Sequence, residues 1–282
     1  WPEPGTERSV RLAPMFTFDP DGSYVMPAHF GPRPLHPKSS GWYRDVTAMV
    51  VTYTTDPDLL ARHLPPPFRV SADPTITVFY ACNRQVDWLA GHGYNMIAVS
   101  AATEFDGQQD QLTGPYTLVM WENLTDPILS GRELQGIPKV YADIPDHSVI
   151  DGQWRATAGH FGHPIVDLAI DDLRPATDDE IAEGLDDRAG TTPMAWRYFP
   201  GLLGFGQSVS EPTTFPSEDE FTSIEVGTGS IEWHELTWEQ NPTQFHIVNS
   251  LAALPVLEQR PALVTKGATN LFVMDDLPRT IS

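Results

Sequence analysis

Alternating apolar and polar side chains, rich in β-branched and aromatic residues and bounded by turn formers, predict strands along most of this chain. The segments that carry this pattern are 46–54, 75–82, 96–103, 116–121, 140–144, 154–159, 166–170 and 221–238.

Helical signals are fewer. Asp56 followed by Pro57 predicts a capped helix start, and Thr177 with Glu180 has the spacing of a capping box. Residues 241–254 are a third candidate. Numerous strands with short helical interludes predict a mainly β (α+β) fold, an antiparallel barrel or sandwich with a few flanking helices.

The first 40 residues differ from the rest, because they hold eight prolines and no sustained period. We expect an extended N-terminal arm over residues 1–40 without chemistry of its own, and one domain over residues 41–282. The 40% hydrophobic content and eight tryptophans suffice for a sizeable core.

The charge balance narrows the range of partners. Asp and Glu number 38 against 17 Lys and Arg, for a formal net charge of -21. Such a chain repels phosphate backbones and anionic membranes, so neither nucleic acid nor a membrane is expected as a partner. No apolar run is long enough for a membrane helix. The single cysteine, Cys82, favours the reducing cytoplasm, although a leader before Trp1 stays possible.

Common metal and cofactor motifs are missing from the sequence. His160 and His163 are candidate metal ligands, but three-residue spacing on a strand places two side chains on opposite faces. The glycine-rich segments lack the last glycine of a dinucleotide loop, and no Gly-x-Ser-x-Gly elbow occurs. We therefore expect no metal and no cofactor.

Lys139 is the most conspicuous candidate for chemistry. It is one of three lysines, and its neighbours Ile137, Pro138 and Val140 are uncharged. A desolvated lysine loses its proton more easily, and a neutral amine attacks carbonyl carbon to form a Schiff base. An ordinary surface lysine is the alternative interpretation.

The run Gly131-Arg132-Glu133-Leu134-Gln135-Gly136-Ile137-Pro138-Lys139 resembles the signature of the acetoacetate decarboxylase superfamily. The resemblance extends loosely over residues 41–277. It implies a cone-like β-barrel with flanking helices, a Schiff base on Lys139, and assembly into a homo-oligomer. The best-known decarboxylases carry a second lysine where this chain has Val140. Burial alone is therefore expected to activate the amine.

The resemblance also implies roles for residues near the signature. Arg44 resembles the family's carboxylate-binding arginine, with a structural salt bridge as its alternative. Arg132 and Glu133 belong to the signature, as an ion pair that shapes the turn or, for Glu133, as a proton-transfer group. His92, Tyr94 and Glu122 are further candidates for acid, base or substrate contact.

With Gln135 four residues before the lysine, the signature resembles that of the superfamily branch that performs aldol-type condensation, cleavage or dehydration on 2-oxo acids. A side-chain amide can hold a carboxylate that must stay on the substrate. The favoured hypothesis is therefore a Schiff-base lyase of the aldolase or dehydratase type, acting on pyruvate-like oxo acids and an aldehyde. A β-keto acid decarboxylase and a non-catalytic small-molecule-binding barrel are the alternatives.

Overall fold

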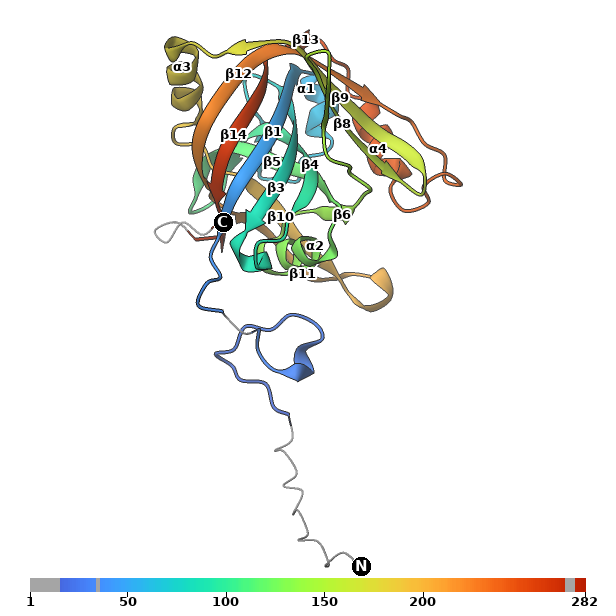
Figure 1. Cartoon of the computed structure of the whole chain (residues 1–282). Coiled ribbons are helices and arrows are strands. Elements are labelled where there is room, and N and C mark those ends of the chain that lie inside the picture. The colour runs from blue at the N-terminus through green and yellow to red at the C-terminus, as the bar shows by residue number, and fades with distance from the viewer. Residues whose placement is uncertain (1–15, 34–35, 272–276) are drawn as a thin grey trace, which may run out of the picture. The chain divides into compact units, whose positions relative to one another are not determined.

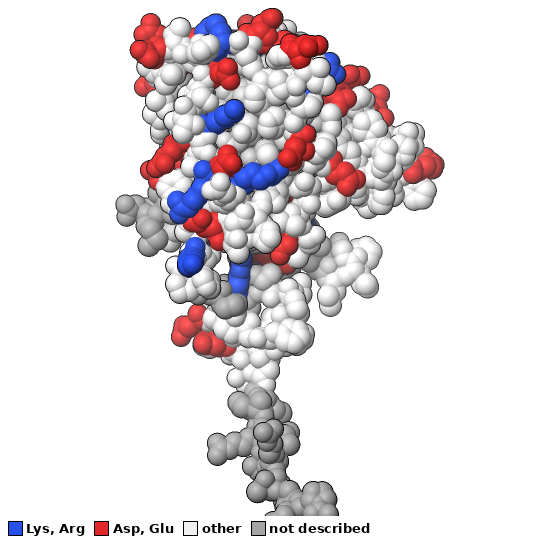
Figure 2. Space-filling model, in the orientation of Figure 1, with Lys and Arg blue, Asp and Glu red and all other residues white. Residues whose placement is uncertain are grey.

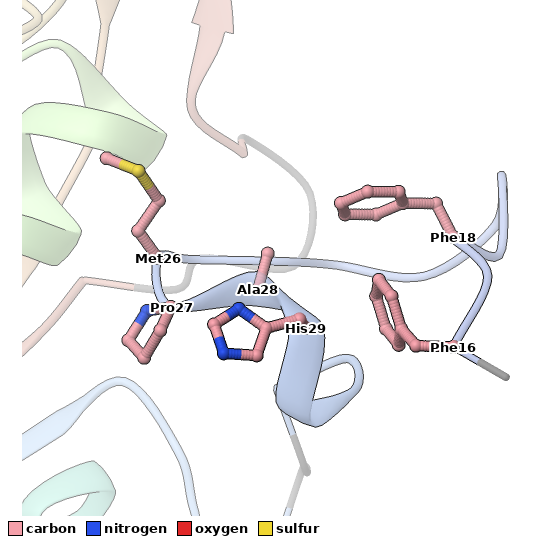
Figure 3. A pocket seen from close by; sticks show the side chains of 6 residues that line it. All are labelled: Phe16, Phe18, Met26, Pro27, Ala28 and His29. Carbon is pink, nitrogen blue, oxygen red and sulfur yellow. The ribbon is translucent and has the colours of Figure 1, made fainter.

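The computed structural model describes residues 16–33, 36–271 and 277–282, and the chain divides into two compact units, Trp1–Pro37 and Lys38–Ser282. Within the described part of the first unit, one 3-10 turn, η1 (Ala28–Phe30), is present. Phe16, Phe18 and Tyr24 meet edge to face, with ring centroids 4.9 to 6.4 Å apart. Figure 3 shows Phe16 and Phe18 on one side of a shallow pocket that Met26 to His29 complete.

The second unit is built around one sheet of 15 strands (Figure 1). Its main path runs β15-β11-β10-β5-β4-β3-β1-β14-β12-β9-β8-β7, while β13, β2 and β6 pair with β1, β4 and β5. The long strands are β1 (Trp42–Thr54), β3 (Thr75–Val86), β4 (Tyr94–Asp106), β5 (Gln111–Glu122), β9 (His163–Pro175), β12 (Glu218–Trp233) and β14 (Ala262–Asn270). The shorter ones are β2 (Phe68–Val70), β6 (Lys139–Tyr141), β7 (Ser148–Ile150), β8 (Gln153–His160), β10 (Met194–Pro200), β11 (Gln207–Thr214), β13 (Glu258–Gln259) and β15 (Arg279–Thr280).

The mainly β prediction is confirmed, but a closed barrel is not. The path has two ends, β15 and β7, which do not pair with each other among the described residues. The sheet is also not purely antiparallel, because β5 pairs in parallel with both β6 and β10.

The helices follow their capping signals. Asp56 accepts hydrogen bonds from the N–H groups of Asp58 and Leu59 and begins α1 (Pro57–Ala61). Thr177 and Glu180 form the predicted capping box of α3 (Asp178–Arg188). The third predicted helix is shorter than expected, α4 (Phe245–Ala252), and α2 (Thr125–Ser130) was not predicted. Two further 3-10 turns are η2 (Asp87–Leu89) and η4 (Leu202–Gly204).

Side chains on the two faces of the sheet enter different cores. The main core takes alternate residues of the central strands, including Met49, Ile76, Ile97 and Trp121. Residues whose side chains point to the opposite face form two smaller clusters, one around Tyr43 and Tyr94 and one around Ala98, Met120 and Ile137. Strand alternation explains the separation, because successive side chains point to opposite faces. The candidate site lies with the smaller clusters.

The expectation that His160 and His163 lie on opposite faces of one strand is wrong. They are paired across the β8–β9 hairpin and separated by Phe161 and Gly162, both of which have positive φ. Two central residues with positive φ are typical of a tight hairpin turn, which reverses the chain between the two histidines.

Charge is spread over the surface, as the composition predicts. Figure 2 shows acidic side chains scattered over the visible face with few basic ones between them. None of the described helices has the length and apolar character needed to cross a membrane.

Candidate active site

The signature forms the end of a helix, and the chain then turns sharply at Gly136 before it reaches Lys139. α2 continues into a π-helical turn, η3 (Gly131–Gln135), and Gly136 then adopts a left-handed conformation with φ 77°. The Ile137 N–H donates to the Gly131 carbonyl oxygen at 3.1 Å, which closes the turn. π-Helical turns are rare and occur often at functional sites.

Lys139 is the first residue of β6, and its partner strand supplies a carboxylate. β6 runs parallel to β5, with Lys139 beside Met120. Glu122 lies two residues beyond Met120 on the same face of β5. Lys139 Nζ donates to Glu122 Oε1 at 2.8 Å, and the two side chains are 6% and 0% exposed.

The amine is therefore buried, as its uncharged neighbours predicted, and it also contacts a carboxylate. A carboxylate in contact with an amine favours the ammonium form and opposes desolvation. Lys139 and Glu122 share a site from which water is largely excluded.

The buried environment of Glu122 makes its carboxylate a better proton acceptor. Burial raises the pKa of its carboxyl group, and the nearby Lys139 ammonium and Tyr94 hydroxyl oppose part of that rise. Its second oxygen, Oε2, is buried without a hydrogen-bond partner among the described residues. An under-solvated carboxylate with a raised pKa accepts protons more readily than one in water.

Tyr94 and Tyr43 form a buried pair of tyrosines on the same side of the sheet as one of the smaller clusters. The two tyrosine hydroxyls are 3.2 Å apart, and Trp88 Nε1 donates to the Tyr43 hydroxyl at 3.0 Å. Burial raises the pKa of Tyr43 to about 12 and that of Tyr94 well above its usual value. Both hydroxyls therefore stay protonated near neutral pH.

Gly131 leaves room for the lysine side chain. A Cβ at this position would lie 2.5 Å from Lys139 Cε, 2.6 Å from Cδ and 2.8 Å from Nζ. Any side chain larger than hydrogen would displace the amine. The glycine at the head of the signature is thus explained by contact with the lysine at its end.

Apolar side chains cover the same face beside the pair. Ala98, Met120 and Ile137 are buried together, and the partly buried Phe79, Met96 and Phe215 pack against them. These groups offer no hydrogen bonds, so they strengthen the electrostatic interaction between Lys139 and Glu122.

The other signature residues are held mainly through the backbone. Arg132 Nη1 donates to the Lys139 carbonyl oxygen at 2.8 Å. The Glu133 and Gln135 carbonyl oxygens accept from Arg197 and Thr213. The half-buried side chains of Glu133 and Gln135 make no hydrogen bond or ion pair within the described ranges, so Arg132 and Glu133 do not form the expected ion pair.

Arg44 and His92 lie apart from the contacts around Lys139. Arg44 is about half exposed and binds Asp87 through two nitrogens, at 2.9 and 2.6 Å, which is the structural salt bridge named as its alternative. His92 is exposed in the turn between η2 and β4. The cluster therefore contains Lys139, Glu122, Tyr94 and Arg132 from the predicted set.

Sequence reasoning missed the roles of Gly131, Tyr43 and Trp88. It had named Glu122 as a candidate but had not paired it with Lys139. The available signal was a glutamate at the end of an otherwise apolar strand, because a glutamate is rarely fully buried without a partner.

Among the residues that the structure describes, one group of side chains elsewhere has metal-ligand character. Asp167, Glu232 and His234 present ligand atoms within 4.8 Å of one another, from β9 and the end of β12. His234 Nε2 lies 2.8 Å from Asp167 Oδ2, so a hydrogen bond accounts for the contact without a metal.

Comparison with known families and proteins points to one family. The family model for acetoacetate decarboxylase matches residues 25–266. Curated acetoacetate decarboxylases from Burkholderia cenocepacia and Burkholderia multivorans are 31% identical over 147 and 145 residues, which is 49% of this chain. The matches cover 57% and 56% of those relatives, so the chain spans little more than half their length.

Solved structures extend the likeness in fold over most of the chain. Acetoacetate decarboxylase from Legionella pneumophila has a TM-score of 0.68 at 18% identity, covering 89% of this chain and 92% of its own. The enduracididine biosynthesis enzyme MppR, complexed with the condensation product of pyruvate and imidazole 4-carboxaldehyde, has 0.68 at 16%, with coverages of 94% and 98%. An acetoacetate decarboxylase-like enzyme from Sphingomonas wittichii RW1 has 0.67 at 17%, with coverages of 93% and 99%.

Proposed function

The chain belongs to the acetoacetate decarboxylase family, and we propose that it is a Schiff-base-forming lyase in which Lys139 attacks the ketone of a small oxo acid. The observation that carries the proposal is the buried contact of 2.8 Å between Lys139 Nζ and Glu122 Oε1. Nucleophilic catalysis requires a nucleophile and a base within hydrogen-bond distance of each other, so this contact supports those two roles for Lys139 and Glu122.

In the first step, the Glu122 carboxylate accepts a proton from Lys139. Proton transfer from the Lys139 ammonium to the Glu122 carboxylate gives a neutral amine and a neutral acid. The amine then adds to the ketone carbon to form a carbinolamine. The Glu122 proton passes to the departing hydroxyl group, and loss of water leaves the iminium. The carboxylate is regenerated for the next step, so protons and charge balance across the sequence.

The next step separates the candidate reactions. An iminium of pyruvate becomes an enamine only when a base removes a methyl proton, and we assign that step to the regenerated Glu122 carboxylate. The enamine carbon then attacks an aldehyde. Decarboxylation needs no base at that point, because the electrons come from the broken carbon–carbon bond. A buried carboxylate beside the amine therefore favours aldolase or dehydratase chemistry on pyruvate-like acids. The pyruvate condensation product in MppR is in keeping with this choice.

We assign the substrate carboxylate to Arg132 in preference to Arg44. Asp87 already binds Arg44 through two of its donors, Nε and Nη2, whereas Arg132 has one hydrogen bond, to the Lys139 carbonyl oxygen, within the described residues. A guanidinium with free N–H groups can hold a carboxylate through two hydrogen bonds. The half-buried Gln135 amide is a second donor close in sequence.

Borohydride trapping followed by intact and peptide mass spectrometry tests the proposal. With pyruvate, reduction of the imine gives an N-(1-carboxyethyl) group on Lys139. With acetoacetate, a decarboxylase gives an N-isopropyl group, since the carboxylate has left before reduction. Lys139→Met is the control and forms neither adduct.

Each outcome of the trapping experiment supports one of the candidate functions or refutes the proposal. The carboxyethyl adduct with aldehyde consumption supports the aldolase assignment, and the isopropyl adduct supports decarboxylation, which the family's name favours. No adduct with either compound would refute the Schiff-base proposal. Binding without any adduct would instead support a non-catalytic role.

A further inference from the structure

Gln244 is a buried residue whose side chain contacts both strands of the candidate site. It stands at the N-cap position of α4, where a side-chain oxygen often accepts a hydrogen bond from the first turn, but its amide makes no such bond. The amide binds Trp121 of β5 and Tyr141 of β6 instead, and the residue is 5% exposed. None of the steps assigned to Lys139 and Glu122 uses it.

The chemistry of its neighbours fixes the orientation of this amide. Trp121 Nε1 can only donate, so Gln244 Oε1 accepts from it at 2.7 Å. The Tyr141 carbonyl oxygen can only accept, so Gln244 Nε2 donates to it at 2.8 Å. His160 Nδ1 lies 3.2 Å from Nε2 and accepts from its second N–H. Both N–H groups are therefore used, and the oxygen is held by an indole that is 0% exposed.

These contacts matter because β6 is short and has one strand partner. It is three residues long and, among the described residues, pairs only with β5. Pro138 and Ala142 bond to β5 through their backbone groups. By alternation, the carbonyl oxygens of Lys139 and Tyr141 point away from β5. The signature arginine binds the first of these and Gln244 the second, each at 2.8 Å. Gln244 therefore holds the edge of β6 that β5 leaves unpaired.

We propose that Gln244 is a positioning residue, and that its amide ties β6 to a fixed ring on β5 and so keeps Lys139 Nζ within reach of Glu122. Trp121 immediately precedes Glu122, and Tyr141 lies two positions beyond Lys139, so the tie is level with the reacting pair. Successive side chains alternate between faces, so the Trp121 ring lies on the face opposite to Glu122. The inference rests on the proposed function of Lys139 and Glu122.

Gln244→Met tests the tie, since methionine has nearly the same length but offers no comparable hydrogen bond. Asn249→Leu is the matched control in the same helix. The Asn249 amide accepts from the Leu236 N–H at 2.8 Å and donates to the Leu236 carbonyl oxygen at 2.9 Å. Both substitutions remove an amide that anchors α4, but only Gln244→Met releases β6. The measurement is the rate of borohydride-trapped adduct formation at Lys139 over a range of ketone concentrations, with whichever of pyruvate and acetoacetate labels the wild type.

We expect Gln244→Met to lower the maximal trapping rate by about tenfold to a hundredfold, since a misplacement of about 1 Å can cost a hundredfold in rate. The ketone concentration that gives half of this rate should change little, because the tie lies on the face away from the reacting pair. Asn249→Leu should leave both quantities near their wild-type values, even though its thermal midpoint also falls. A loss of stability alone would affect the two variants alike.

Gln244→Glu supplies a second measurement. Its neutral carboxyl group can accept from Trp121 and donate to the Tyr141 carbonyl oxygen, whereas its carboxylate cannot donate. The trapping rate, relative to wild type at the same pH, should therefore recover as pH falls. A Gln244→Glu protein as impaired at every pH as Gln244→Met would overturn the inference. Equal trapping by Gln244→Met and Asn249→Leu would also overturn it.

Backbone hydrogen exchange separates this failure from that of the proposed function. If wild-type protein forms no adduct with either ketone, the Schiff-base proposal fails, and the pairing of β6 decides the role of Gln244. The Ala142 N–H donates to the Glu122 carbonyl oxygen at 3.1 Å, so its exchange reports that pairing. Mass spectrometry must then find faster exchange at Ala142 in Gln244→Met than in Asn249→Leu, and equal rates would refute the tie.

Discussion

Gly131 and Lys139 are in direct contact, although eight positions separate them in the chain. A Cβ built on Gly131 would lie 2.5 Å from Lys139 Cε, closer than any side-chain carbon tolerates. The π-helical turn and the left-handed Gly136 bring the two together. The signature is therefore one packed unit, in which the first residue provides the space that the last one fills.

Gly131→Ala tests this contact. The added methyl group must push the amine away from Glu122, and a misplacement of about 1 Å can cost a hundredfold in rate. We expect borohydride adduct formation to fall by about that factor while the protein stays folded. Gly184→Ala is the matched control, because a Cβ there meets nothing within 4 Å. It lies in α3, where alanine is the better helix former by about 0.5–1 kcal/mol. Equal trapping in the two variants would contradict the packing argument.

Breaking the buried pair should cost more than removing it. Glu122→Gln leaves the Lys139 ammonium without its partner, and losing one member of a buried pair typically costs about 3–5 kcal/mol. The double variant Glu122→Gln/Lys139→Met carries no buried charge, so we expect it to regain most of that loss. Chemical denaturation of the three proteins measures the difference. A double variant less stable than Glu122→Gln would show that the pair stabilises the fold by itself.

Lys139→Met should make stability depend on pH. Burial raises the pKa of Glu122, and Lys139 holds part of that rise back, so the variant has a still higher pKa. A carboxyl group with a raised folded-state pKa binds more protons in the folded state. Its contribution is full below the unfolded value of about 4.3 and is lost as pH rises through the folded value.

The thermal midpoint of Lys139→Met should consequently fall as pH rises from about 4.3 toward and through the raised value. Wild-type protein should show a weaker fall over the same window, because Lys139 compensates the charge. Adding Glu122→Gln should remove the dependence that the lysine variant gains. A flat profile in Lys139→Met would mean that Glu122 is not buried as described.

Much of this fold can be predicted from local sequence patterns, but the site depends on which strands pair with each other. Strand alternation predicted β1, β3, β4 and β5, and capping residues predicted α1 and α3. Pro200 and Pro212 weaken the strand signal of β10 and β11, since proline cannot donate to a ladder. The central strand β14 was also missed, because a glycine inside a strand weakens the strand signal as a proline does. It contains Gly267, where a Cβ would lie 2.0 Å from the Glu220 carbonyl oxygen.

The amine could be predicted from its neighbours, whereas its partner could not. Uncharged residues beside Lys139 indicated burial, and the lysine is 5% exposed. Contact with Glu122 requires β6 to pair in parallel with β5 across the α2 connection. No local pattern specifies that pairing. The hydrogen bonds that Tyr43 makes with Trp88 and Tyr94 likewise join η2, β1 and β4, and β1 and β4 are the two strands that flank β3 in the sheet.

Arg132 and Arg44 can be distinguished by a charged and an uncharged probe. Arg132→Lys keeps the charge but loses the planar fork, so we expect the KM for exchange of the pyruvate methyl protons in D2O, followed by NMR, to rise by about tenfold or more. Exchange of acetone, which has no carboxylate, should change far less. Arg44→Lys should leave both nearly unchanged, because Arg44 is half exposed and already bound to Asp87. The measurement is the ratio of KM values for the two ketones in each variant. A selective loss of pyruvate affinity in Arg44→Lys, with Arg132→Lys unaffected, would return the carboxylate to Arg44.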